Sequence, residues 1–191
     1  MIHLIGAGGH GKVVIDAWLA GGGAREHLRV RDGRAAMTDR TVLGLPVLSP
    51  EIDDSLADTE VHVAIGDNTA RANLIAAALA VGARLRTIRH PSSSVSTFAH
   101  IGDGGFIGAG AVIGPEVTTG PGVIVCAGAV IDHDSRIGDH AFVGPGAVIA
   151  SRLSIGARAV VRAGAVVTRD LATGEIWPAP PASSSAGFQT A

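Results

Sequence analysis

The sequence predicts an α/β domain followed by a long parallel β-solenoid. Three observations predict this fold class. Short strands alternate with helices up to about residue 90, a glycine-rich turn follows the first strand, and beyond residue 90 large aliphatic residues recur every six positions. Aromatic residues make up only 3% of the 191 residues, and tyrosine is absent. A narrow core lined by short branched side chains fits this composition, because it leaves little volume for large rings.

The first ninety residues show the alternating pattern of a small α/β sheet. Strands are expected over residues 2–5, 28–31, 61–65 and 85–88, and helices over residues 12–19 and 69–81. Residues 6–11 form a glycine-rich turn, and residues 34–50 are expected to be a loop with one edge strand. Strands that alternate with helices imply a parallel sheet with helices on its faces.

The rest of the chain follows a six-residue repeat. Twelve of thirteen positions in the series are aliphatic: Val95, Ile101, Ile107, Ile113, Val125, Ile131, Ile137, Val143, Ile149, Ile155, Val161 and Val167. Only Thr119 interrupts the series. A period of six fits neither a helix nor simple strand alternation, but it fits a short strand and a turn. Each coil would bury its aliphatic residues against the coils above and below, so the solenoid is stable only as a stack.

Composition and charge exclude several classes of protein. The net charge is -2 and the sequence has no basic run, so the footprint of non-specific nucleic-acid binding is missing. The single cysteine rules out an intramolecular disulfide framework and indicates a reducing compartment. No apolar run approaches the roughly 18 residues of a membrane span, and the opening MIHLIGAGG reads as a strand and a turn rather than a signal peptide. We therefore expect a cytoplasmic protein without a membrane span.

One hexad departs from the repeat and carries reactive side chains. The stretch Ile131–Arg136 holds Asp132, His133 and Asp134 where the neighbouring turns hold glycine, alanine and proline. Acyl transfer to an amine or hydroxyl needs a base with a pKa near neutrality, and histidine is the usual one. A neighbouring carboxylate can fix the imidazole tautomer and stabilise the imidazolium. His133 is therefore the candidate base, with Asp134 or Asp132 as its partner.

The N-terminal turn allows two kinds of ligand. Gly6, Gly8 and Gly11 satisfy G-x-G-x-x-G after a strand, and Asp32 follows about twenty residues later, as in dinucleotide-binding domains. However, ninety residues hold one mononucleotide-binding half and leave no place for the catalytic residues of a dehydrogenase. A helix N-terminus behind such a turn also suits the phosphates of a sugar nucleotide. A sugar nucleotide is therefore favoured over NAD.

Together these motifs resemble a family of hexapeptide-repeat transferases. The turn Gly6–Gly11, the repeat, and the motif His133-Asp134-Ser135-Arg136-Ile137-Gly138-Asp139 resemble the sialic acid O-acetyltransferase and bacillosamine-type nucleotide-amino-sugar N-acetyltransferase family. The resemblance implies a Rossmann-like nucleotide-sugar-binding domain at 1–90, a left-handed parallel β-helix at 91–182 and a flexible tail at 183–191. It implies three hexads per coil, hence roughly four coils. Only the resemblance implies the left-handed sense of the helix, because left-handed crossovers are rare and the periodicity does not predict one.

The resemblance also implies the ligands and the site. Acetyl-CoA would be the co-substrate, a nucleotide-linked amino sugar the acceptor, and the assembly a homotrimer with sites between subunits; no metal is expected. His133 would be the general base and Asp134 its orienting partner. The substrate-binding residues would be Gly8, Gly9, His10, Gly11, Asp32, Gly66, Asp67 and Asn68. In this set His10 would hold the pyrophosphate and Asp32 would lie near the base, whereas Asp67 could equally be a helix N-cap.

The contacts with acetyl-CoA are expected at His140, Ser151, Arg152 and Arg162. In the family a second histidine helps to hold the acyl donor at the position of Phe142, and this chain has His140 two residues earlier. The arginines of the last coils could meet the CoA phosphates or could form a solvated face. The family's Gly-x-Pro-Ala-Arg-like ending is replaced by Trp177–Ala182 and a serine-rich tail without a basic residue.

Three other functions remain as alternatives. A sugar O-acetyltransferase shares the histidine motif, since the acceptor atom is not written in it, but the nucleotide-like turn favours a nucleotide-linked acceptor. A zinc carbonic anhydrase would need three histidine ligands, and His100, His133 and His140 lack a recognised ligand spacing. A purely structural solenoid would require neither the His133-Asp134 pair nor the glycine-rich turn.

Overall fold

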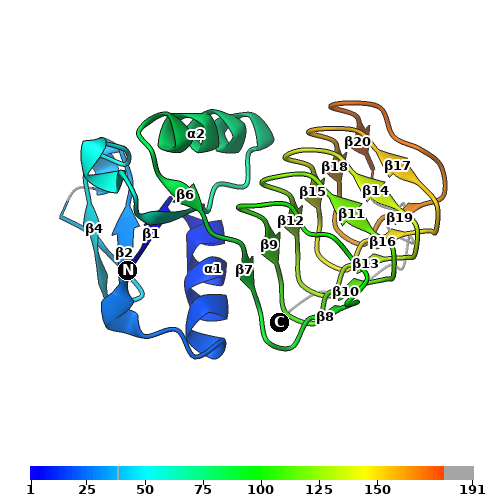
Figure 1. Ribbon diagram of the computed structural model, residues 1–191, viewed down its shortest axis with the longest axis horizontal. Helices are drawn as coiled ribbons and strands as arrows, with labels where there is room; N and C mark the ends of the chain where they lie inside the picture. The colour runs from blue at the N-terminus through cyan, green and yellow to red at the C-terminus, as the bar shows by residue number, and fades with distance from the viewer. Residues whose placement is uncertain (38, 179–191) are drawn as a thin grey trace, which may run out of the picture.

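The computed structural model describes residues 1–37 and 39–178. It confirms the predicted fold class, an α/β unit followed by a left-handed parallel β-helix whose coils stack side by side (Figure 1). The predicted tail at 183–191, and the part of the Trp177–Ala182 segment beyond Pro178, lie outside the described residues. The proposed division of the chain at residue 90 stays a prediction.

The α/β unit is built on one sheet with the strand order β3-β4-β2-β1-β5-β6. Its strands are β1 (Ile2–Ile5), β2 (Leu28–Arg31), β3 (Thr41–Val42), β4 (Leu45–Leu48), β5 (Glu60–Val63) and β6 (Arg84–Leu85). The helices are α1 (Gly9–Ala20) and α2 (Asn68–Ala80), with short 3₁₀ turns at Arg25–His27, Ala35–Met37 and Asp54–Leu56. Central strand β1 pairs in parallel with β2 and β5. Its apolar side chains are buried on both faces of the sheet, as expected of a parallel strand between two helical layers.

Three elements differ most from the sequence prediction. Helix α1 begins at Gly9 rather than Lys12, so the end of the glycine-rich turn is already helical. Residues 34–50 hold two short strands instead of one, because β4 pairs with the free edge of β2 and β3 folds back on β4. The single strand expected over 85–88 is two strands. β6 completes the sheet, and β7 (Ile88–Arg89) pairs with the β-helix.

The β-helix is a prism with three faces. Face 1 consists of β7, β9 (Phe106–Ile107), β12 (Ile124–Val125), β15 (Phe142–Val143), β18 (Val160–Val161) and β20 (Ile176–Trp177). Face 2 consists of β8 (Ser94–Val95), β10 (Val112–Ile113), β13 (Val130–Ile131), β16 (Val148–Ile149) and β19 (Val166–Val167). Face 3 consists of β11 (Thr118–Thr119), β14 (Arg136–Ile137) and β17 (Ser154–Ile155). Stacked partners such as Val112, Val130 and Val148 are eighteen residues apart, which confirms three hexads per coil.

Ten of the twelve repeated aliphatic residues form one continuous buried core, and Val95 and Ile101 pack against it. Thr119 fits this core because its hydroxyl oxygen accepts a hydrogen bond from the backbone N–H of Gly102, at 3.0 Å. Face 1 has six strands and face 2 has five, so the prism is longer than the roughly four coils expected. The extra strands, β7 and β20, lie outside the run of regular hexads and therefore gave no periodic signal.

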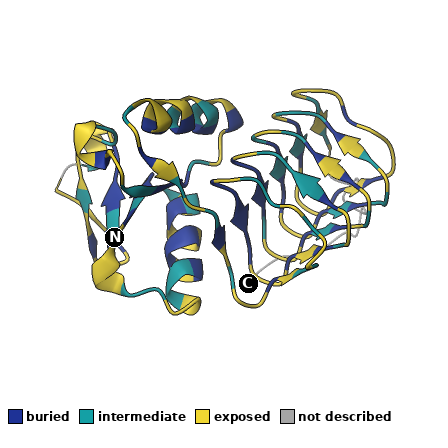
Figure 2. Cartoon of the chain, viewed as in Figure 1, coloured by how far each residue is buried: buried dark blue, intermediate teal, exposed yellow. Residues whose placement is uncertain are grey.

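The α/β unit packs against face 1 of the prism. One apolar cluster joins Val14 and Ala17 of α1 to Ile88, Phe106 and Ile124 of face 1. Figure 2 shows β9 and β12 of face 1 as buried, whereas the outer turns of the prism are exposed. Ile176, in the last strand of face 1, is 54% exposed. The α/β unit therefore covers the first coils of face 1 and leaves the last ones open.

Candidate functional site

His133 lies in the turn between β13 and β14, at the corner where face 2 meets face 3. Its Nδ1 is 2.6 Å from Oδ2 of Asp134, and the two side chains are 40% and 50% exposed. Asp132 instead accepts a hydrogen bond from the backbone N–H of His133, at 2.8 Å. Asp134 is therefore the carboxylate that touches the imidazole. A carboxylate on Nδ1 leaves Nε2 free to act as a base.

The backbone around His133 is fixed by the coils on either side. Asp134 has a φ of 62° and donates its N–H to the carbonyl of Pro115 in the preceding coil, at 3.0 Å. The carbonyl of His133 accepts the N–H of Arg152 in the following coil, also at 3.0 Å. A Cβ at Gly114 would lie 2.9 Å from the nitrogen of His133. The imidazole is thus carried by a turn with little freedom to shift.

The predicted acetyl-CoA contacts divide between corners of the prism. Ser151 and Arg152 occupy the equivalent turn one coil after His133, at the same corner. Arg162 lies at the corner between faces 1 and 2, and His140 at the corner between faces 3 and 1. The imidazole of His140 packs beside Gly122 under α2, and burial there lowers its pKa. The structure therefore brings two of the four residues to the His133 corner and leaves His140 and Arg162 away from it.

The glycine-rich turn forms one wall of a pocket of about 370 Å³. Gly8, Gly9 and Lys12 line this wall, and residues 36–37 and 40–42, including Arg40, supply much of the rest. Helix α1 has no side-chain cap at its N-terminus, so its first N–H groups are available to a ligand. Of the described residues that line the pocket, two are basic and none is acidic. Free N–H groups and two cations suit an anionic ligand, and we refer to this candidate site as the anion-binding pocket.

Gly11 is required by the close approach of α1 to the turn. A Cβ at this position would collide with the carbonyl oxygen of Gly6. Gly11 therefore shapes the turn and does not line the pocket with Gly8 and Gly9.

Asp32 supports the turn from behind. Its Oδ2 accepts the N–H of Ala7 at 3.0 Å and is 2.7 Å from Nη2 of Arg34. The hydrogen bond from Arg34 lowers the pKa of Asp32 to about 2, so the carboxylate is charged at neutral pH. Its oxygens are used by the protein itself, and the guanidinium of Arg34 lies beside Gly8. The sequence analysis did not predict a role for Lys12, Arg34 or Arg40. The one feature that could have pointed to them is the number of cations that flank the turn.

The side chain of His10 faces the prism rather than the anion-binding pocket. Its ring meets the ring of Phe106 edge-on, with the centroids 5.1 Å apart. Burial lowers its pKa to about 4, so the imidazole is neutral at pH 7. Its Nε2 is buried without a hydrogen-bond partner among the described residues. Nothing in this geometry directs the His10 side chain toward a pyrophosphate in the pocket, and that role stays a prediction.

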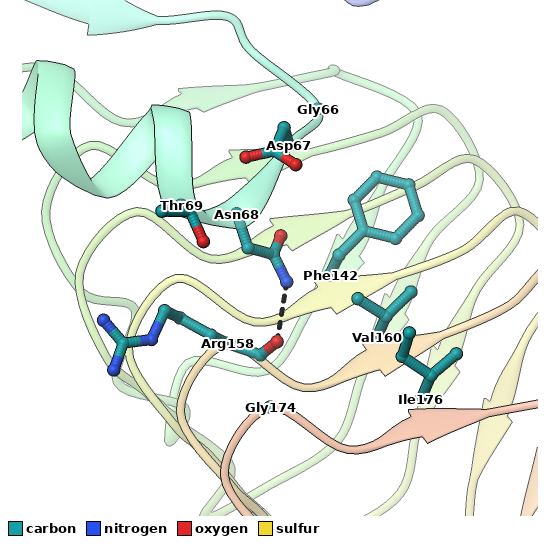
Figure 3. A pocket seen from close by; sticks show the side chains of 9 residues that line it. All are labelled: Gly66, Asp67, Asn68, Thr69, Phe142, Arg158, Val160, Gly174 and Ile176. Atoms are coloured by element: carbon teal, nitrogen blue, oxygen red, sulfur yellow. Dashed lines mark hydrogen bonds between the residues drawn. The ribbon is translucent and has the colours of Figure 1, made fainter.

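The loop Gly66–Asn68 lines a second pocket of about 510 Å³, between α2 and the prism (Figure 3). The prism side of this pocket is largely apolar and the loop side is polar. Asp67 caps α2, since its Oδ1 accepts the N–H of Ala70 at 2.8 Å, so the N-cap prediction is confirmed. The amide of Asn68 donates to the carbonyl of Arg158 at 2.9 Å. The lining residues are Gly66, Asp67, Asn68, Thr69, Phe142, Arg158, Val160, Gly174 and Ile176.

Two further findings concern the described residues only. They contain no group of three or more histidine, cysteine, aspartate or glutamate side chains placed to hold a metal ion. They also contain no helix that is long and apolar enough to cross a membrane. The three histidines of the carbonic anhydrase alternative include His133 and His140, which stand at different corners of the prism.

Three family models match the chain. The PglD N-terminal domain matches residues 1–78, the hexapeptide repeat of succinyl-transferase matches 99–133, and the bacterial transferase hexapeptide (six repeats) matches 134–169. No curated protein sequence matches the chain.

Solved structures are similar over almost the whole length. One is a histidine-to-alanine variant of GDP-perosamine N-acetyl transferase from Caulobacter crescentus, in complex with CoA and GDP-perosamine. It is 32% identical, with 92% of this chain and 91% of that chain covered and a TM-score of 0.81. Another is the acetyltransferase domain of PglB from Neisseria gonorrhoeae in complex with acetyl coenzyme A. It is 31% identical, with 92% and 94% covered and a TM-score of 0.76. WeeI from Acinetobacter baumannii is 21% identical, with 92% and 95% covered and a TM-score of 0.63, and shares the fold.

Proposed function

The chain belongs to the family of hexapeptide-repeat N-acetyltransferases of nucleotide-linked amino sugars, and on that premise we propose that it transfers the acetyl group of acetyl-CoA to the amine of such a sugar. The observation that carries the proposal is the 2.6 Å contact between His133 and Asp134 at an exposed corner of the prism. A purely structural solenoid gives no reason for this pair. Nor does a structural solenoid explain the anion-binding pocket at the glycine-rich turn of the α/β unit.

The residues at this corner support direct transfer. The amine nitrogen of the sugar attacks the thioester carbonyl while Nε2 of His133 takes a proton from that nitrogen. Asp134 stabilises the resulting imidazolium. The C–N bond forms, the C–S bond breaks, and the departing CoA thiolate takes up the proton. Backbone N–H groups on the prism wall would meet the oxyanion. The only cysteine, Cys126, is a poor nucleophile because burial raises its pKa to about 11.

The anion-binding pocket supports a nucleotide-linked acceptor. Two phosphates would meet the free N–H groups of α1 and the cations Lys12 and Arg40, with Arg34 beside Gly8. This arrangement favours a sugar nucleotide over an unlinked sugar. It also favours the N-acetyltransferase over its nearest rival, an O-acetyltransferase acting on sialic acid or a polysaccharide precursor.

The positions of the two sites support a homotrimer. The α/β unit covers face 1, whereas His133 stands at the corner between faces 2 and 3, which is the corner opposite face 1. A chain would therefore present its sugar to the His133 of a neighbour. Face 2 carries an outward stripe of valines beside the catalytic corner: Val112, Val130, Val148 and Val166. Two of them are 40% and 52% exposed, which fits a surface that packs against another copy.

We also place the reaction in the cytoplasm. This part of the proposal rests on the sequence, whose single cysteine indicates a reducing compartment.

The proposed function is tested by incubating the protein with acetyl-CoA and a panel of UDP-, GDP- and dTDP-linked amino sugars, following the release of free thiol. We expect one member of the panel to release thiol and to yield a product that resists hydroxylamine, as an amide does. Thiol release only with sugars that lack an amine, giving a hydroxylamine-sensitive ester, would establish the O-acetyltransferase instead. Matched sugars without the nucleotide serve as the control for the role of the phosphates.

A further inference from the structure

Among the residues that the structure describes, the largest fully buried side chain is that of Arg71 of α2, which the sequence pattern did not single out. It is 0% exposed, and within the described residues no carboxylate forms an ion pair with it. It lies one turn into α2, where the helix dipole disfavours a positive charge. Burial lowers its pKa to about 10, so the guanidinium remains charged at neutral pH. Burying a cation in such a place costs free energy, and the hydrogen bonds of the guanidinium must offset that cost.

All the hydrogen-bonding directions of this guanidinium are used. Nη1 donates to the carbonyls of Ile65 and Gly66, at 2.9 and 3.0 Å. Nε donates to the carbonyl of Gly122 at 2.8 Å, and Nη2 to the carbonyl of His140 at 2.6 Å. Nη2 also donates to Oδ1 of Asn68 at 2.6 Å. One side chain therefore ties the loop before α2 to the prism.

The prism atoms that take part form a regular series. Gly122, His140 and Arg158 are equivalent positions in three successive coils, all with positive φ, at 63°, 56° and 57°. Arg71 binds the carbonyls of the first two, and the amide of Asn68 binds the carbonyl of the third, at 2.9 Å. Arg71 and Asn68, which we call the clamp, thus fix the α/β unit to three consecutive coils at one corner.

The clamp adjoins the second pocket directly. The loop Gly66–Asn68 forms its polar side, and Arg158 and Phe142 lie across from that loop (Figure 3). We propose that Arg71 is a positioning residue for the acceptor. It fixes where the Gly66–Asn68 loop lies along the axis of the prism, and so where along that axis the sugar amine meets the thioester. This inference rests on the proposed function, and it assigns Asn68 to the clamp rather than to direct contact with the sugar.

The test compares Arg71→Met with Arg71→Lys in the full-length protein. Displacement of a bound group by about 1 Å can cost about a hundredfold in rate. We expect Arg71→Met to raise the KM for the nucleotide amino sugar at least about tenfold, with the KM for acetyl-CoA within about twofold of the wild type. Arg71→Lys keeps the charge but not the fork of donors, so an intermediate KM is expected. If Arg71→Met instead lowers kcat and leaves both KM values unchanged, the variant has only lost folded protein. That result would overturn the proposal.

A second measurement tests the clamp independently of the proposed activity. Amide hydrogen exchange should become faster in Arg71→Met at residues 64–68, 120–122 and 138–140, and should be unchanged at the catalytic turn 132–135. If the wild type acetylates no amino sugar, the proposed function fails, and the exchange data still decide whether Arg71 orders the loop. If Arg71→Met does not fold, Asn68→Ala and Arg71→Lys take its place. Unchanged exchange and unchanged kinetics in the variants that fold would refute the positioning role.

Discussion

At the scale of single residues, the account depends on how one imidazole is held. The residues predicted His133 as the base but left its partner open between Asp132 and Asp134, because both adjoin it in the chain, and only the family resemblance favoured Asp134. The turn makes the choice. With Asp134 at a φ of 62°, its carboxylate lies 2.6 Å from Nδ1 of His133, while Asp132 serves the backbone. The conformation of a turn residue, which spacing alone does not determine, decides which acid is the partner.

Replacement of Asp134 by Asn should lower kcat by about tenfold to a thousandfold, because the neutral amide no longer stabilises the imidazolium. The KM for both substrates should change little, since the side chain has its role only when the proton moves. The measurement is steady-state kinetics with the best nucleotide amino sugar. Asp132→Asn is the matched control: its amide oxygen can still accept the backbone N–H of His133, so it should have a much smaller effect. Equal losses in the two variants would contradict the assignment.

The residues that sequence reasoning missed share a physical cause. Arg40 reaches the anion-binding pocket because residues 36–37 and 40–42 lie against the glycine-rich turn, and this placement was not predictable from their composition. Arg71 lay hidden inside an ordinary helical pattern. Its role becomes visible only when carbonyls from distant turns, such as Gly122 and His140, are brought to it. Long-range polar contacts leave no periodic signal.

At the scale of elements, regular patterns predicted most of the structure. β1 and β2 have the bounds that were expected, and the aliphatic residues of the series lie in the prism core or pack against it. The errors fall where a strand lacks a repeat. β7 and β20 extend face 1 by backbone pairing outside the six-residue series, and the hairpin of β3 and β4 exists because β2 has a free edge. Edge pairing is decided by the tertiary structure rather than by local preference.

The glycines of the turns offer a test at this scale. In Gly114→Ala the new Cβ would lie 2.9 Å from the nitrogen of His133, so the catalytic turn must shift by a few tenths of an ångström. We expect a loss of activity larger than the loss of folded protein measured by thermal unfolding. Gly102→Ala is the control, since its Cβ would collide with the carbonyl group of Gly120, at a different corner. If both variants lose activity only in proportion to stability, the turn is not holding His133 in a required place.

At the scale of the whole molecule, the α/β unit and the corner that carries His133 lie on opposite sides of one prism. The sequence predicted both sites but not their separation, because that depends on which face the α/β unit covers. Phe106 and Ile124 decide it: they put apolar side chains on the outside of face 1, where α1 packs. The same separation is what makes a site shared between copies the simplest way to join the two substrates.

A mixed oligomer tests the shared site. His133→Ala removes the base, and the double variant Lys12→Glu, Arg40→Glu reverses the charge of the anion-binding pocket. Each should be inactive alone. When the two are unfolded, mixed in equal amounts and refolded together, about a quarter of the sites in a cyclic trimer would combine an intact corner with an intact pocket. Thiol release should recover to about that fraction, and a site contained in a single chain would give no recovery.

The most direct measurement is the single-turnover rate of acetyl transfer in His133→Ala, with enzyme in excess over the nucleotide amino sugar and saturating acetyl-CoA. The account predicts a rate about a hundredfold to ten-thousandfold below that of the wild type. It also predicts an unchanged circular dichroism spectrum and unchanged binding of the nucleotide sugar. A variant that transferred the acetyl group as fast as the wild type would show that the imidazole is not the base, and the account of the site would be wrong.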